Sequence, residues 1–108
     1  MDLTSAQRAQ LRALANGIDT ILQIGKDGLG DNLVQQADDA LEARELIKGR
    51  VLDNNLEYDA RTAAQALAKA TRSEVVQVIG SKFVLYRESH SKPREKRIEL
   101  KKPKKDRG

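Results

Sequence analysis

The sequence contains no cysteine, which excludes disulfides, thiolate metal ligands and cysteine nucleophiles. Aromatic residues make up only 3% of the chain, so the core must be built from Leu, Ile, Val and Ala, and stacking of bases on aromatic rings is expected to be minor. No apolar run approaches the roughly 20 residues of a membrane-spanning helix, and the opening residues lack the basic start and apolar stretch of a signal peptide. We therefore expect a cytoplasmic protein that does not enter a membrane.

Positive charge is present but unevenly placed. The formal net charge is +4 over 108 residues, a length that supports one domain with a modest core. From residue 88 onward nine Lys and Arg stand against four Asp and Glu, whereas residues 1–87 carry a net charge of −1. Such a basic block is typical of an arm that neutralises phosphates, and the alternative is a disordered, solubilising end. We place one domain in residues 1–87 and a basic, flexible tail in residues 88–108.

Three segments have the periodicity of amphipathic helices, over about residues 5–16, 31–44 and 60–70. Thr4 and Gln7 have the spacing of a capping box at the start of the first helix, and Gly17 suits a left-handed position after its end. Asp31 or Asn32 is expected to cap the second helix. The predicted core positions are Leu11, Leu14, Ala15 and Ile18 in the first helix, Val34, Ala37 and Leu41 with Leu33 and Ala40 in the second, and Ala64, Leu67 and Ala68 in the third.

Four short apolar segments predict strands, at residues 20–24, 46–52, 75–79 and 83–86. Gly80 and Ser81 between the last two suit a type II′ hairpin turn, because glycine takes the positive φ at the first central position. The element order α-β-α-β-α-β-β indicates an α/β fold with a four-stranded mixed sheet, partly parallel through helical crossovers. We expect the three helices mainly on one face of this sheet.

The segment Gly25-Lys26-Asp27-Gly28 lies between a predicted strand and a helix start. Glycines there let the backbone approach another chain, free N–H groups attract a phosphate, and Lys26 adds a mobile positive charge. Asp27 has the wrong sign for anion binding, and a sharp structural turn is the competing interpretation of the motif alone. The spacing matches neither the P-loop nor the dinucleotide-binding fingerprint.

Several blocks in order resemble the CRM domain family (chloroplast RNA splicing and ribosome maturation). They are residues 23–29, 45–48, 77–80 and 83–87, together with a similar first helix, so that the resemblance covers residues 3–87. The resemblance implies a fold like the C-terminal domain of translation initiation factor three, and RNA binding through a Gly-x-x-Gly loop similar to that of KH domains. It also implies association with precursors of the large ribosomal subunit. The family's loop residues match Gly25, Lys26 and Gly28, and its first-helix arginine matches Arg12.

This chain departs from the family pattern at two places. Ser81 stands where a basic residue is frequent, so the hairpin tip is expected to bind phosphate less strongly. Gly49 and Arg50 interrupt the apolar second strand and are expected to mark a bulge or a sheet edge.

Other basic residues could extend the contact with RNA. They are Arg8, Arg12, Lys48, Lys82 and Arg87. The alternative is an ordinary solvated helix face for the first two and edge protection of strands for the rest. Tyr86, within an apolar run, is expected to pack in the core rather than stack on a base.

No residue pattern predicts catalysis or a metal site. His90 is the sole histidine and is expected to be solvated, and Asp38, Asp39 and Glu42 are expected to form a solvated acidic face. We therefore expect no cofactor, no metal, no small-molecule substrate and no enzyme activity.

Together these observations predict a monomeric RNA-binding factor that acts on ribosomal RNA in assembly of the large subunit. The main alternative is an adaptor that docks on a ribosomal protein or an enzyme through an exposed sheet face. A non-specific DNA-binding protein is a third possibility, although no helix is rich in major-groove-reading Arg, Asn or Gln.

Overall fold

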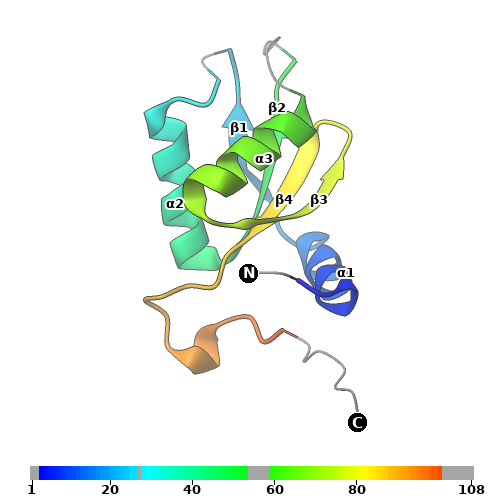
Figure 1. The fold of residues 1–108 in the computed structure, drawn as a ribbon, viewed down its shortest axis with the longest axis vertical. Helices are drawn as coiled ribbons and strands as arrows, with labels where there is room; N and C mark the ends of the chain where they lie inside the picture. Colours follow the sequence, from blue (N-terminus) through cyan, green and yellow to red (C-terminus); the bar gives the residue numbers. More distant parts are fainter. Residues whose placement is uncertain (1–2, 27, 54–58, 101–108) are drawn as a thin grey trace.

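The computed structural model describes residues 3–26, 28–53 and 59–100 (Figure 1). Its elements follow the predicted order: α1 Ser5–Ala15, β1 Thr20–Ile24, α2 Asp31–Arg44, β2 Leu46–Val51, α3 Ala60–Thr71, β3 Glu74–Ile79, β4 Lys82–Tyr86 and a short 3₁₀ helix η1 Arg94–Lys96.

The predicted start of α1 is confirmed, whereas two other helix boundaries differ from expectation. The Thr4 hydroxyl accepts the Gln7 N–H at 3.1 Å, and the Gln7 side chain accepts the Thr4 N–H at 3.0 Å. Gly17 is not left-handed, because the chain leaves α1 through Asn16 in right-handed geometry. The N-cap of α2 is Gly30, not Asp31 or Asn32, and no side chain caps this helix.

The four strands form one mixed sheet in the order β1-β2-β4-β3. β1 and β2 are parallel, joined by α2, and the other two pairings are antiparallel. Gly80 has φ 57°, while Ser81 has no positive φ, as the predicted type II′ turn requires. The predicted fold class is confirmed.

Two apolar layers lie on opposite faces of the sheet. α2 and α3 pack on one face, against Leu22, Ile24, Ile47, Phe83 and Leu85. The prediction of helices mainly on one face holds for these two. α1 instead packs on the other face, and its predicted core residue Leu14 is 45% exposed. The strand residues beneath α1 are Leu46, Val76, Val84 and Tyr86.

Gly49 lies in a central strand, so the prediction of a sheet edge there is wrong. The nearby register shift falls in β1, between Thr20 and Leu22. The structure gives glycine a different reason, since a Cβ at position 49 would lie 2.5 Å from Cζ of Phe83. The missing side chain makes room for the only phenylalanine ring in the core.

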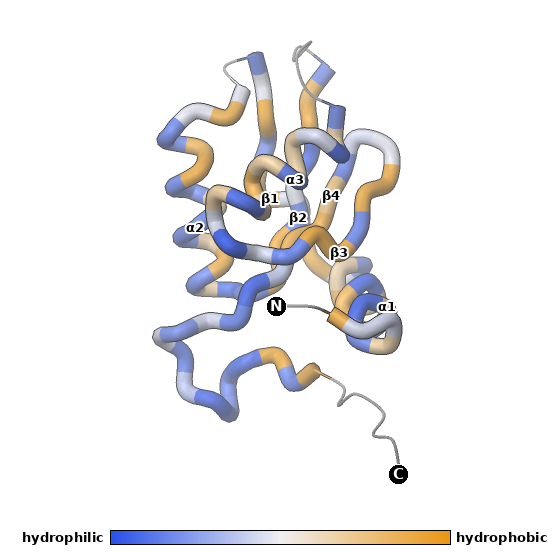
Figure 2. Tube along the Cα trace, in the orientation of Figure 1, coloured by the Kyte–Doolittle hydropathy of each residue, from blue (hydrophilic) through white to orange (hydrophobic). Residues whose placement is uncertain are grey.

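The predicted flexible tail is wrong for residues 88–100, which pack against the domain. Ile98 and Leu100 pack against the α1 side of the core, and Figure 2 shows the chain turning hydrophobic there. The buried Glu45 carboxylate accepts the backbone N–H groups of Ser89 at 2.8 Å and Ile98 at 2.6 Å. The rest of the predicted tail, residues 101–108, lies outside the described residues.

Candidate nucleic-acid interface

One end of the sheet is left open on the face that α1 covers elsewhere. Strand register places Gln23, Arg50, Lys82 and Ile79 side by side across β1, β2, β4 and β3 at this end. All four residues are exposed. Two cations therefore lie on neighbouring central strands in a row that none of the described helices covers.

A second row lies one step closer to α1. It contains the half-buried Lys48, the buried Val84 and the half-buried Gln77, again on adjacent strands. The C-terminal end of α1, at Ala15 and Asn16, lines a groove with this row. Within the described part of the chain, the side chains of Lys48, Arg50 and Lys82 form no hydrogen bond or ion pair. Their charges are available to an anionic partner.

The predicted glycine loop lies at the same end of the sheet, directly after β1 (Figure 1). The Gly28 N–H donates to the Gly25 carbonyl at 3.0 Å, and Gly28 has φ 69°, a left-handed conformation suited to glycine. Lys26 is exposed at the turn, and Asp27 lies outside the described residues. The loop and the two rows together form a continuous end of the molecule, where β1, β2 and the β3–β4 hairpin all terminate.

The two arginines of α1 differ from each other. The Arg8 guanidinium donates to the Val75 carbonyl on the edge strand β3 and lies 4.0 Å from the Glu74 carboxylate. Arg8 therefore fastens α1 to the sheet. Arg12 is half-buried, and its side chain makes no polar contact with any other residue of the described ranges. Only Arg12 keeps its guanidinium free for a ligand.

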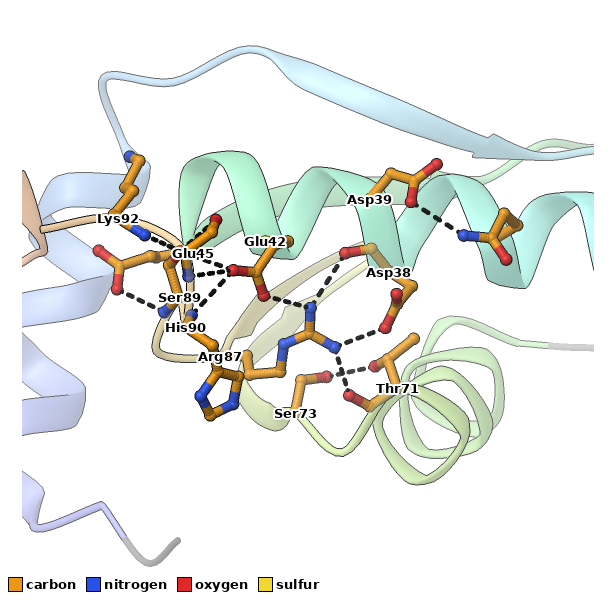
Figure 3. Close-up of polar contacts among 12 residues, drawn as sticks. Asp38, Asp39, Glu42, Glu45, Thr71, Ser73, Arg87, Ser89, His90 and Lys92 are labelled. Carbon is orange, nitrogen blue, oxygen red and sulfur yellow. Dashed lines mark hydrogen bonds and ion pairs between the residues drawn. The ribbon is translucent and has the colours of Figure 1, made fainter.

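The Arg87 side chain forms hydrogen bonds and ion pairs within the protein, so the structure does not support its predicted contact with RNA. Its guanidinium binds Asp38 Oδ1 at 2.6 Å and the Thr71 carbonyl at 2.8 Å (Figure 3). The Glu42 carboxylate lies 3.4 Å away on the other side. With only 14% of its side chain exposed, Arg87 joins α2 to the end of α3.

The acidic side of α2 has a structural role, and the prediction that Asp38 and Glu42 are merely solvated is wrong. Glu42 Oε2 accepts the Ser89 hydroxyl and the N–H groups of His90 and Ser91. Hydrogen bonds from Ser91 and Ser89 lower the pKa of Glu42 from 4.5 to about 2. The acids of α2 thus hold Arg87 and the start of the C-terminal segment, while the His90 ring is exposed, as expected.

Neither aromatic ring in the described ranges is available to a ligand. Phe83 and Tyr86 are both buried, which confirms the prediction that Tyr86 packs in the core. Burial raises the pKa of the Tyr86 phenol to about 12, and the nearby charges of Glu45 and Glu88 contribute. Among the described residues, only aliphatic and polar side chains are available on this surface for contact with a base.

Four residues in the two rows of this surface, Gln23, Arg50, Gln77 and Ile79, are exposed or half-buried but are not among the predicted site residues. Arg50 follows Lys48 by two positions and so shares its face of the strand. Strand residues alternate between the two faces of a sheet, and this alternation is the feature of the sequence that places Arg50 beside Lys48. Ile79 resembles an ordinary strand residue in sequence, and only the position of α1 shows that it is uncovered.

The described residues form neither a metal site nor a membrane-spanning helix. These ranges contain no group of three or more His, Cys, Asp or Glu side chains that could hold a metal ion. None of the helices they form combines the length and apolar character that crossing a bilayer requires.

Comparison with known proteins identifies the family. Residues 3–87 match the CRS1 / YhbY (CRM) domain. The chain belongs to this CRM domain family. Among its relatives, "Probable RNA-binding protein YqeI" of Bacillus subtilis is 48% identical over 91% of this chain and 98% of its own length. "Probable RNA-binding protein MJ0652" of Methanocaldococcus jannaschii is 38% identical over 95% of this chain and 75% of its own length.

A solved structure supports the fold of this CRM protein. The solution structure of the hypothetical protein SAV1595 from Staphylococcus aureus has a TM-score of 0.72 and 51% sequence identity. It covers 93% of this chain and all of its own. The family match ends at residue 87, whereas the packed structure continues to residue 100.

Proposed function

We propose that this CRM protein binds the backbone of RNA with the open end of its sheet, and that its RNA is ribosomal RNA of the assembling large subunit. The observation that carries the binding surface is the convergence of Lys48, Arg50 and Lys82 on one uncovered sheet face. Lys26 and the glycine loop extend the surface at the same end. The relatives' names support RNA as the ligand.

The chemistry favours contact with phosphates over recognition of sequence. Lysine and arginine neutralise phosphates and release counterions, so the affinity must fall as salt rises. Four cations on a single-stranded backbone correspond to a slope of about −3 in log affinity against log salt, at about 0.7 per phosphate. The uncapped start of α2 next to the loop adds unsatisfied N–H groups that favour an anion.

Charge-removal variants test the surface. We expect Lys82→Ala and Lys26→Ala each to weaken RNA binding and to reduce the salt slope by about 0.7, with thermal stability unchanged because both side chains are exposed. Lys69→Ala is the matched control, since this exposed lysine lies on α3, on the other side of the sheet. Equal salt slopes for Lys82→Ala, Lys26→Ala and Lys69→Ala would show that net charge alone matters and that the surface is wrongly assigned.

Sedimentation of cell extract tests the ribosomal client. We expect the protein to migrate with particles at or just below the large subunit at low salt and to be released at high salt. The Lys26→Ala variant should be released at a lower salt concentration than the wild type. A protein that stays at the top of the gradient at both salt concentrations would contradict the ribosomal assignment and favour an adaptor or another RNA.

A further inference from the structure

A groove separates the end of α1 from the β3–β4 hairpin. It is lined by Ala15, Asn16, Lys48, Gln77, Ile79, Lys82, Phe83 and Val84. Its volume of about 130 Å³ is well below the roughly 300–1,000 Å³ of pockets for drug-sized ligands. The groove therefore suits a single small ring rather than a whole cofactor.

Ile79 gives this groove an exposed apolar wall. It is 63% exposed, more than any other large hydrophobic residue in the described ranges. A single exposed apolar side chain needs no explanation by itself. Ile79, however, pairs across the strands with Lys82, and Lys48 lines the same groove. An apolar wall at the edge strand, with two unpaired cations on the neighbouring strands β4 and β2, matches a ligand that combines a flat apolar ring with adjacent negative charge.

Two side-chain amides line the groove beside Ile79. Asn16 and Gln77 make no side-chain hydrogen bond to another residue of the described chain. A primary amide carries two donors and an acceptor, the same groups with which proteins read the polar edge of a nucleobase. The apolar wall and the amides therefore complement the face and the edge of one base.

We infer that this groove takes one unpaired nucleobase of the bound RNA, with Ile79 against the ring, Asn16 and Gln77 at its polar edge, and Lys48 and Lys82 on the flanking phosphates. This inference rests on the proposed RNA binding and adds a preference to it. A paired base presents neither its face nor its Watson–Crick edge, so the groove can be filled only by a nucleotide in a loop, a bulge or a single strand. The protein then binds RNA with an unpaired segment more tightly than a continuous duplex.

The experiment compares three RNA probes of equal length and charge at one salt concentration. The first is a hairpin with an unpaired loop, the second has the same loop made of abasic nucleotides, and the third is a continuous duplex. We expect the wild type to bind the first about fivefold more tightly than the other two, at the low end of what a base stacked on an aromatic ring contributes, because the Ile79 wall is aliphatic. Ile79→Ser and Gln77→Ala should lose this advantage and bind the abasic loop as the wild type does.

Two control variants separate the base contact from other effects. Leu14→Ser also removes an exposed apolar side chain, at a position on α1 that does not line the groove, and should keep the full preference. Lys82→Ala should weaken binding to all three probes. If the wild type binds RNA but Ile79→Ser and Gln77→Ala leave the preference for the base-bearing loop unchanged, the nucleobase site is refuted while RNA binding stands. If the wild type binds none of the probes, the proposed function itself fails.

Discussion

Replacing Glu45 by alanine should release the C-terminal segment from the domain. Glu45 follows α2, is fully buried and has φ 69°, an unusual conformation for a residue with a side chain. Its carboxylate accepts the N–H groups of Ser89 and Ile98, and its carbonyl accepts the N–H of Arg87. One residue thus holds both ends of the segment that packs against the α1 side of the core.

The expected loss of stability follows from the two side-chain hydrogen bonds. A hydrogen bond to a charged group contributes about 1.5–3 kcal/mol, and an alanine leaves both N–H groups without this acceptor. Because the variant no longer has to bury a carboxylate, part of that loss is recovered, and we expect a net loss of about 3 kcal/mol in the free energy of unfolding. At about 4–8 °C per kcal/mol for a domain of this size, the melting temperature should fall by about 12–24 °C.

Thermal unfolding and amide hydrogen exchange together measure this effect. In Glu45→Ala the amides of Ser89 and Ile98 should lose protection, whereas those of α3 should exchange only as fast as the lower global stability requires. Glu45→Gly removes the same hydrogen bonds but relieves the positive φ, so it should be about 1 kcal/mol more stable than Glu45→Ala. Glu95→Ala, an exposed glutamate of η1, is the control and should melt like the wild type.

A Glu45→Ala protein with wild-type melting and unchanged protection of residues 88–100 would refute the reasoning. It would mean that Ile98 and Leu100 hold the segment by apolar contacts alone. Equal stability of Glu45→Ala and Glu45→Gly would refute the smaller point, that the backbone at this position is strained.

Three further changes test the fold. Gly49→Ala should destabilise by about 1–3 kcal/mol in chemical denaturation, because its Cβ collides with the Phe83 ring, whereas Gly17→Ala, whose Cβ has ordinary contacts, should be nearly neutral. Glu42→Gln should lower stability at pH 7 and flatten the dependence of stability on pH. The pKa of Glu42 is about 2 in the folded state, so the wild type loses this stabilisation as pH falls from about 4.5 to 2. An equally steep dependence in the variant would contradict this role of Glu42. Arg87→Met should lower the free energy of unfolding by about 2 kcal/mol in thermal melting. This is less than the 3–5 kcal/mol of a fully buried pair, because the Asp38 side chain is 46% exposed. The salt slope of RNA binding in this variant should equal that of the wild type.

Local patterns predicted the elements well. The capping box of Thr4 and Gln7, the type II′ turn at Gly80 and the element order depend on neighbours in sequence, and the structure has all three. An amphipathic pattern shows that one face of a helix is buried but not which face of the sheet it meets. The placement of α1 opposite α2 and α3, and the exposure of Leu14, therefore required the structure.

Counting charges along the sequence gives the wrong role to the basic C-terminal segment and to Arg87. The excess of Lys and Arg in residues 88–108 predicts a tail, but Ile98 and Leu100 pack against the domain and the Glu45 carboxylate binds the backbone of this segment. Arg87 was interpreted as a surface cation because it ends a strand. The acids Asp38 and Glu42, one helical turn apart, were the local signal of a bound cation, yet 45 or more residues separate them from Arg87 in sequence.

The sequences of β2 and β4 nevertheless show where the open surface begins. Along one face of β2 the residues change from Leu46 to Lys48 and Arg50, and along the paired face of β4 they change from Tyr86 and Val84 to Lys82. Because the two strands are antiparallel, the change from apolar to basic residues runs in opposite sequence directions in β2 and β4. Both changes nevertheless occur at nearly the same level of the sheet, since Lys48 pairs with Val84 and Arg50 with Lys82. α1 and residues 98–100 cover the apolar half, which means that the helix and the C-terminal segment determine how much of the cationic half remains open to RNA.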